Sequence, residues 1–332
     1  MPGKHIKLIL FLFLSLSLKA QYNTNVHSIS RREGLSNGAV NSIVNDAEGY
    51  MWFGTWNGLN RYDGSSIVTF MPGGRPFSLH NHVVRELYPT ERGPLWMLTN
   101  RGISRYDNLA NKFYSFFTSE PEQINYENDI SFCHSDKSGT LAAVYGSGIY
   151  RYDSVAGQFF KIRFDEGSLP VSRGIKRLYA IGSEFYCITG DNMLFRISGN
   201  NLMSIMQLPV SAAITSSLGV LIRQRPYLLI TQRGANAMVA DIEKGRVNPV
   251  TVADDIITSF APSADRGRLW AGTEKGRIYN LNITGWKPEI LNTLSDLMIN
   301  NPIATRVLSI CETEPDILWI GTDGNGVYNL RL

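Results

Sequence analysis

Cysteine and histidine are scarce in this sequence, which contains three cysteines and five histidines among 332 residues. Cys133, Cys187 and Cys311 follow neither the Cys-x-x-Cys nor the His-x-Cys spacing of metal and redox sites. Each falls in a stretch that we expect to form a strand, so the pattern predicts three buried thiols. A labile disulfide or a reactive thiol is the alternative interpretation.

Motifs of metal-dependent and phosphate-handling enzymes are missing as well. The sequence has no His-Glu-x-x-His motif and no P-loop. His80-Asn81-His82 has the spacing of two metal ligands, but no third ligand pattern completes it. We therefore predict no catalytic residue, no cofactor and no metal, and we expect these histidines to lie in an ordinary loop.

Long apolar runs are confined to the first twenty residues, which have the layout of a secretory signal peptide. Lys4 and Lys7 form a basic start, the apolar run 8–18 is short, and cleavage is expected after Ala20. The domain layout expected is a signal peptide at 1–20 and one domain at 21–332, in the periplasm. Leu18 is a poor residue before a cleavage site, so an uncleaved anchor is the alternative. No membrane insertion is expected after cleavage, because no later stretch approaches the roughly 18 apolar residues of a membrane helix.

The charge is nearly balanced once the leader is set aside. Residues 1–20 carry three lysines and no acidic residue, so the 32 basic and 29 acidic residues of the chain become 29 and 29. Proteins that bind nucleic acid usually show a strong basic excess. We therefore expect no nucleic-acid partner, and a ligand that is neutral or weakly charged.

One segment returns along the whole chain. The sequence WFGTWNGLNRYD at 52–63 reappears as WMLTNRGISRYD at 96–107 and, in part, as YGSGIYRYD at 145–153. Later copies are worn, but a shared position, usually threonine, can be followed through all of them at 55, 99, 145, 189, 231, 273 and 322. The sequence therefore contains seven copies of one structural unit.

Each copy has the pattern of four short strands joined by tight turns. Its first strand is an alternating apolar run, and these runs open near 40, 83, 130, 175, 212, 256 and 307. Four strands repeated at this period are typical of a propeller blade, and no helical periodicity is evident. The sequence predicts an all-β fold, a seven-bladed β-propeller of four-stranded blades.

The seventh copy stops at Leu332, just after its third strand, while the β-like stretch Val26–Ser30 precedes the first blade without a partner. Open sheet edges invite aggregation, so a ring of blades favours closure. We expect this N-terminal strand to be the outer strand of blade seven.

The first copy carries the residues of a known family. EGLSNGAVNSI at 33–43 followed by GYMWFGT at 49–55 resembles the two-component regulator propeller repeats in the N-terminal periplasmic sensor region of bacterial hybrid two-component system proteins. The resemblance implies an oligosaccharide ligand, a second propeller, a membrane helix and kinase parts, and a homodimer. This sequence departs from that plan after one propeller, so we expect either a piece of a longer sensor or a stand-alone relative.

Two other functions stay open at this stage. Propeller enzymes that act on carbohydrate, such as lyases or hydrolases, gather non-repeating residues over the central hole, and a sequence can hide such a site. A platform for protein–protein interaction is the third class. We expect a binding and sensing module, and not an enzyme.

One repeat position holds four of the six tryptophans: Trp52, Trp96, Trp270 and Trp319. Such recurrence predicts packing between neighbouring sheets, and Trp286 is expected in the core as well. The recurring Arg-Tyr-Asp triplet is also interpreted as structural, with Asp starting a turn and Arg pairing with a neighbouring blade. Trp56 has no counterpart in other copies. It is either a stacking platform for a sugar ring or a loop residue that packs on the adjacent blade.

The candidate ligand site lies where the turns between second and third strands share one face with the blade-to-blade connections. The connections around 80–82 and 126–128 border that face. Its non-repeating polar and aromatic residues suit a hydroxyl-rich ligand. We call them the rim residues: Trp56, Asn57, Asn100, Arg101, Asp191, Asn192, Arg233, Asn236, Glu274, Lys275, Asp323 and Asn325.

Overall fold

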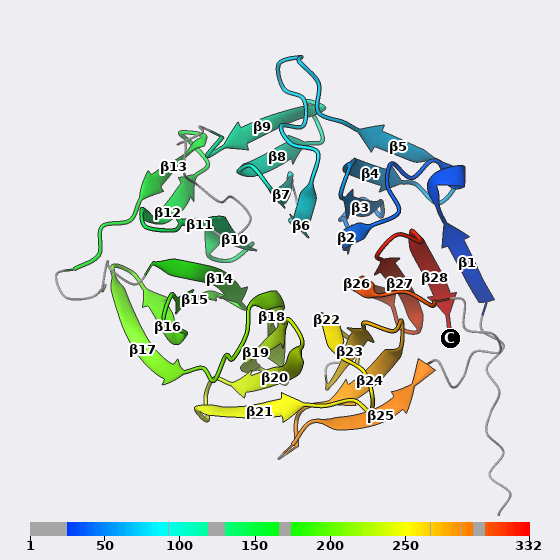
Figure 1. The fold of residues 1–332 in the computed structure, drawn as a ribbon. Coiled ribbons are helices and arrows are strands. Elements are labelled where there is room, and N and C mark those ends of the chain that lie inside the picture. Colours follow the sequence, from blue (N-terminus) through cyan, green and yellow to red (C-terminus); the bar gives the residue numbers. More distant parts are fainter. Residues whose placement is uncertain are drawn as a thin grey trace, which may run out of the picture.

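The fold is known from a computed structural model. It describes residues 25–91, 93–118, 130–165, 174–265, 267–285, 287–294 and 303–332. The expected signal peptide at 1–20, the connection at 126–128 and Trp286 lie outside these ranges. Seven four-stranded antiparallel sheets stand around a central axis (Figure 1). The prediction of an all-β, seven-bladed propeller is confirmed.

Each blade runs outward from an inner strand at the axis, and the inner strands begin within two residues of the expected positions. Blades one to three contain β2 (Val40–Asn45), β3 (Met51–Thr55), β4 (Gly58–Tyr62), β5 (Ile67–Phe70), β6 (Val84–Tyr88), β7 (Leu95–Thr99), β8 (Ile103–Asp107), β9 (Lys112–Phe116), β10 (Ile130–Ser135), β11 (Gly139–Val144), β12 (Gly148–Asp153) and β13 (Gln158–Lys161). Blades four and five contain β14 (Ile175–Ile181), β15 (Glu184–Thr189), β16 (Met193–Ser198), β17 (Asn201–Gln207), β18 (Ile214–Ile222), β19 (Arg225–Gln232), β20 (Ala235–Asp241) and β21 (Arg246–Val250). Blades six and seven contain β22 (Ile257–Pro262), β23 (Arg268–Thr273), β24 (Ile278–Asn282), β25 (Glu289–Thr293), β26 (Val307–Glu314), β27 (Ile317–Thr322) and β28 (Val327–Arg331).

The ring is closed by the N-terminal strand β1 (Asn25–Ile29). It pairs antiparallel with β28, from Asn25 opposite Arg331 to Ile29 opposite Val327, and Figure 1 shows the blue strand beside the red one. Ser30 ends the pairing because it caps the single turn of 3-10 helix η1 (Arg31–Glu33). The expected closure of blade seven is therefore confirmed.

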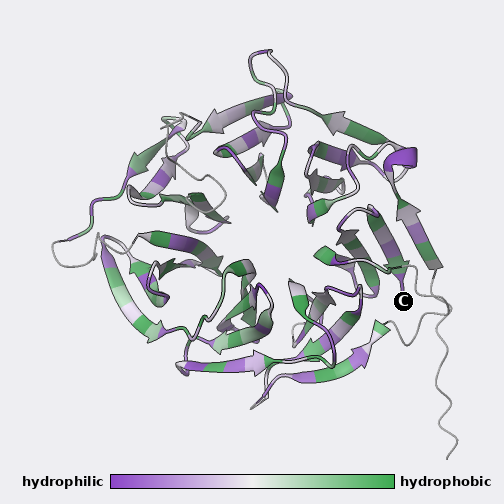
Figure 2. Cartoon of the chain, viewed as in Figure 1, coloured by the Kyte–Doolittle hydropathy of each residue, from purple (hydrophilic) through white to green (hydrophobic). Residues whose placement is uncertain are grey.

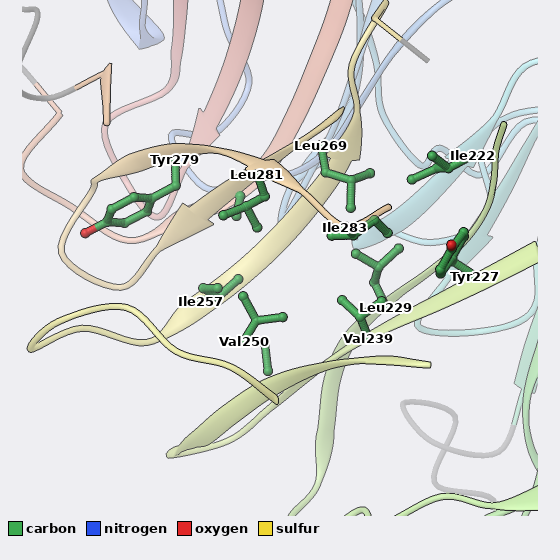
Figure 3. Packing of buried hydrophobic residues seen from close by; sticks show 12 residues of the cluster. Ile222, Tyr227, Leu229, Val239, Val250, Ile257, Leu269, Tyr279, Leu281 and Ile283 are labelled. Carbon is green, nitrogen blue, oxygen red and sulfur yellow. The ribbon is translucent and has the colours of Figure 1, made fainter. Parts of the chain in front are cut away.

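Hydrophobic and hydrophilic residues are interleaved within the strands of the blades (Figure 2). In the described residues the buried apolar side chains form seven clusters, one between each pair of adjacent blades. Figure 3 shows the cluster between blades five and six, where Leu229 and Val239 pack with Leu269 and Leu281. The core is thus a ring of interfaces, and each blade depends on its neighbours.

The repeated tryptophan belongs to these interfaces. Trp52 is fully buried, and its ring lies 5.4 Å from Tyr106 of the next blade. Trp96 lies 4.9 Å from Tyr152 of blade three, and the half-buried Trp319 lies 6.0 Å from Phe53 of blade one. These ring-centroid distances fall within the usual range of aromatic pairs. The packing interpretation is confirmed for this position.

Glycine in the Trp-x-Gly-Thr strand permits the close approach of the next blade. A Cβ on Gly54 would lie 2.8 Å from a methyl of Val84, and a Cβ on Gly321 would lie 2.7 Å from the carbonyl oxygen of Val40. Both neighbours belong to the inner strand of the following blade. The glycine therefore sets the spacing between these blades.

The Arg-Tyr-Asp triplets are structural, as interpreted. Asp63 accepts hydrogen bonds from the backbone N–H groups of Ser65 (2.8 Å) and Ser66 (2.7 Å). These bonds and those of the two serine hydroxyls hold the pKa of the carboxyl group well below its usual range. Arg105 reaches blade three, where its Nη1 donates to the Tyr152 hydroxyl at 2.7 Å. The triplet thus closes a turn and joins two blades.

The three thiols are free and lie in strands β10, β15 and β26. Cys133 and Cys187 are buried, and burial raises the pKa of both thiols, that of Cys187 to about 12. Cys311 is only half-buried, although desolvation raises its pKa to about 11. The expectation of three buried thiols is therefore right for two, because the innermost strand of blade seven leaves Cys311 at a partly open position.

Candidate functional site

The turns between second and third strands are bonded to the connections that lead into each blade. In six blades the backbone N–H of the first turn residue donates to the backbone carbonyl of the residue just before the inner strand, at 2.9–3.2 Å. The donor and acceptor pairs are Trp56 to Ala39, Asn100 to Val83, Gly190 to Gly174, Arg233 to Ala213, Glu274 to Ile256 and Asp323 to Arg306. The turns and connections of these blades therefore share one face.

The recurring threonine fixes the shape of these turns. Thr55 is fully buried and its hydroxyl donates to the carbonyl of Gly58 at 2.8 Å. Thr99 and Thr322 make the same bond to Gly102 (3.0 Å) and Gly326 (2.8 Å). A buried hydroxyl that satisfies a turn carbonyl holds the turn rigidly. The variable residues on top of the turn are thus presented by a constant support.

Trp56 stands on this support with half of its side chain, 50%, exposed to solvent. In the part of the chain that the structure describes, no aromatic ring stacks on its indole. The next residue, Asn57, lies 3.0 Å through its Oδ1 from Nδ1 of His82, which belongs to the connection between blades one and two. The backbone N–H of Gly58 donates to the His82 carbonyl at 2.7 Å. Trp56, Asn57 and His82 therefore form one ordered group at the face.

The other rim residues are spread over the turns of the remaining blades. Half-buried positions are taken by Asn100 and Asn192. The exposed members are Arg101, Asp191, Arg233, Asn236, Glu274, Lys275, Asp323 and Asn325. The structure places these turns on the same face, but each residue stays with its own blade.

Several rim residues have local structural partners. Asp191 accepts a hydrogen bond from the Thr189 hydroxyl at 2.5 Å. Lys275 donates through Nζ to the backbone of Asp254. Asn236 offers its backbone carbonyl to the side chain of Gln232 at 2.9 Å. These three residues help to shape their own loops.

A second group of residues at this face escaped the sequence analysis. The inner strands of six blades carry a β-bulge at their second residue, and the skipped residues are Asn41, Arg85, Lys176, Thr215, Thr258 and Leu308. Bulges commonly re-aim a side chain beside a functional site. Lys176 shows the effect, because its Nζ donates to Oδ1 of the rim residue Asn192 at 3.1 Å. A break in the alternation of the inner strands is the signal that could have revealed them.

The pentapeptide Gly34-Leu35-Ser36-Asn37-Gly38 matches the Gly-x-Ser-x-Gly pattern of hydrolases, a match that the sequence analysis passed over. In that pattern the serine stands on a sharp turn between a strand and a helix. Here Ser36 lies between η1 and β2, and its hydroxyl accepts from Asn60 Nδ2 at 2.8 Å and lies 3.2 Å from Thr55 Oγ1. Ser36 therefore supports the first blade and does not have the setting of a nucleophile.

Among the described residues, no group of three or more histidine, cysteine, aspartate or glutamate side chains is arranged to hold a metal ion. No helix in the described ranges combines the length and the apolar character that crossing a bilayer requires.

Comparison with known proteins finds a family resemblance at the start of the first blade. Residues 34–57 match the family model described as the two component regulator propeller. A stretch of 63 residues is also 43% identical to histidine kinase P4 of Formosa agariphila, covering 19% of this chain and 5% of that protein.

Solved structures resemble the whole ring. The extracellular domains of two hybrid two component systems from B. thetaiotaomicron match 92% and 93% of this chain, with TM-scores of 0.67 and 0.65 and 20% identity in both cases. This chain covers 41% and 39% of their lengths. A chain of the mitotic checkpoint complex matches 93% of this chain at a TM-score of 0.65 with 10% identity. At these identities the likeness establishes the propeller fold alone. The function has to be argued from the residues on the face that the turns and connections share.

Proposed function

We propose that this chain is the extracytoplasmic ligand-sensing propeller of a two-component system and that it binds an oligosaccharide on the rim residues. The observation that carries the proposal is Trp56, a half-exposed indole without a ring partner in the described residues, on a turn fixed by Thr55. The propeller repeat and the extracellular domains that share the fold support the sensing role. Location in the periplasm is part of the same proposal.

The chemistry of the rim suits a sugar. An indole face gives a platform for the C–H face of a pyranose ring, while amide, guanidinium and carboxylate groups match hydroxyl donors and acceptors. Asn57 and His82 lie next to Trp56 and are already oriented by their mutual contact. Ordered polar groups bind at a smaller entropic cost than mobile ones. The proposed ligand is therefore a neutral or weakly charged oligosaccharide that the protein does not turn over.

Signalling requires more than this propeller. The chain spans about two fifths of the extracellular domains that it resembles. We propose that it works with the remainder of a sensor, including a second propeller, and as a homodimer. The ring closed by β1 lets the propeller fold as a unit within such an assembly.

A glycan panel tests the proposal against its alternatives. The full chain is incubated with each glycan, and the melting temperature and the products are measured. If the chain is a sensor, one glycan class raises its melting temperature, because a ligand that binds only the folded state stabilises that state. The glycan itself stays uncleaved. Cleavage of the glycan would identify an enzyme, and neither response over the whole panel would favour an interaction platform.

A further inference from the structure

A second cavity lies at the outer side of blade two and contains none of the rim residues. Its volume is about 790 Å³, and it lies between the connection 71–80 and strand β9, with Arg105 of β8 and Gly157 of blade three at its border. We call it the β9 pocket. In Figure 1 the loop that follows β5 projects outward beside β9. Ligand cavities usually measure roughly 300–1,000 Å³, so the space suits a small ring compound.

Phe77 forms one wall of the β9 pocket under backbone strain. Its φ is +63°, in the left-handed region that bulky residues avoid, and its side chain is 51% exposed. The strain is held in place, because the Phe77 carbonyl accepts from the backbone of Phe113 at 2.9 Å and the Ser78 hydroxyl donates to the Gly73 carbonyl at 2.6 Å. Burial does not explain this aromatic ring. Strain of this kind collects at ligand-binding positions.

The ring of Phe77 is oriented by neighbours on β9. It meets the Tyr114 ring edge-on at 5.7 Å, and the Lys112 ammonium lies 4.8 Å from its centroid. The rings held in this way, Phe77 and Tyr114, belong to residues that line the cavity. Aromatic faces of this kind accept the C–H face of a sugar ring.

The charge of the β9 pocket has one sign. Arg75 and Arg105 line it together with the imidazole of His80, and no aspartate or glutamate does. Arg105 is fixed by its bond to Tyr152 and by stacking 4.9 Å from the Tyr114 centroid. Arg105 is therefore a positioned cation at the edge of the cavity, which suits an anionic group of a ligand.

We infer that the β9 pocket binds a carboxylate-bearing pyranose, a uronic acid residue of a glycan. The ring stacks on Phe77 and Tyr114, and the carboxylate pairs with Arg105 and Arg75. The hydroxyls of Ser78 and Ser115 line the same space and bond the sugar hydroxyls. The inference rests on the proposed function in taking a glycan as ligand, and a glycan with a single uronate agrees with the near-zero charge of the chain.

Small probes test the β9 pocket separately from the rim. Calorimetry on the full chain compares methyl β-D-glucuronide, methyl β-D-glucoside and benzoate at low salt. We expect the glucuronide to bind most tightly, and its affinity to fall as the salt concentration rises, because the contact is partly ionic. Equal binding of the glucoside would overturn the role of the carboxylate, and equal binding of benzoate would overturn the role of the sugar ring.

Two variants and a matched control locate the site. Phe77→Gly weakens glucuronide binding about tenfold without lowering the melting temperature, because glycine adopts a positive φ without strain. Arg105→Lys keeps the charge but loses the planar fork of donors that pairs with a carboxylate, and it weakens binding about tenfold. Arg61→Lys is the control, because Arg61 holds the same repeat position in blade one and stacks 4.6 Å from Tyr50 without lining the pocket.

The outcomes separate this inference from the proposed function. Loss of glucuronide binding in Arg61→Lys equal to that in Arg105→Lys would overturn the inference, as would a Phe77→Gly protein that melts lower and binds unchanged. Trp56→Ala is expected to leave glucuronide binding intact. A chain that binds glucuronide but no oligosaccharide at the rim contradicts the rim proposal alone, and the reverse result contradicts the β9 pocket alone.

Discussion

Replacing Trp56 by alanine separates binding from folding. The indole is half-exposed and lacks a ring partner in the described residues, so its loss leaves few packing contacts behind. Exposed substitutions usually change the free energy of unfolding by less than about 0.5 kcal/mol. Loss of a stacked sugar ring costs about 1.4 kcal/mol, which is a tenfold weaker Kd. We expect a tenfold loss of affinity for the cognate glycan at an unchanged melting temperature.

Trp96→Ala is the matched comparison from the repeated position. Trp96 is 2% exposed and lies within 6.0 Å of four rings, those of Phe116, Phe132, Tyr152 and Phe159. Truncating such a side chain costs about 3–5 kcal/mol. An unfolding entropy of about 2.1 cal/mol/K per residue over roughly 300 residues turns this into a fall of about 5–8 °C in melting temperature.

Calorimetry measures both quantities on each variant. Isothermal titration with the cognate glycan gives the Kd, and a thermal scan gives the melting temperature. An unchanged Kd in Trp56→Ala would place the ligand site elsewhere. A fall in its melting temperature as large as that of Trp96→Ala would show that Trp56 packs on the adjacent blade, and the reasoning from its exposure would be refuted.

Three further predictions concern the ring itself. Deleting residues 25–30 removes five paired residues, among them the buried Ile29, so it should lower the free energy of unfolding by several kcal/mol and promote association. Urea unfolding and light scattering measure the two effects, and a deletion variant with the denaturation midpoint of the full chain would contradict the closure. The three thiols should react slowly with a disulfide reagent at pH 8 in the folded chain and promptly after unfolding, because their raised pKa values, about 11 for Cys311, keep them protonated. In the folded chain the reaction of Cys311 should begin only as the pH approaches that value, and fast reaction of all three thiols at pH 8 would contradict the prediction. Gly321→Ala should lower the free energy of unfolding by about 1–3 kcal/mol in a denaturation curve, because the new methyl would lie 2.7 Å from the Val40 carbonyl oxygen, whereas Gly74→Ala has open space around it and no positive φ and should lose less.

The sequence was sufficient where the structure repeats. Trp52 and Trp96 recur because each places an aromatic ring against the next blade. The period of the repeat led to the count of blades, and the missing fourth strand of the last copy led to the pairing of β1 with β28. A periodic position can be compared across seven copies of the repeat. A copy that departs from the pattern can therefore still be aligned with the help of the others.

The sequence was insufficient where each copy differs. The positive φ of Phe77 depends on a bond from Phe113, thirty-six residues along the chain, and no local pattern predicts it. The bulge at Lys176, whose Nζ donates to Asn192, is a shift of register between β14 and β15 that belongs to the strand pairing and not to the repeat. Trp319 and Cys311, both in blade seven, are more open than their repeat positions suggested.

Closure by β1 also has a consequence for biosynthesis. Ile29 and Val327, which pair in the finished blade, are separated by about 300 residues, so β1 is synthesised long before its partner β28. At about 5–20 residues per second, translation takes roughly 15 to 60 s to cover that distance. During this time β1 has no partner of its own, and closing so long a loop is a late, entropically costly step. The propeller is therefore most exposed to misassembly before β28 is available, because until then blade seven lacks its outer pairing and the ring cannot close.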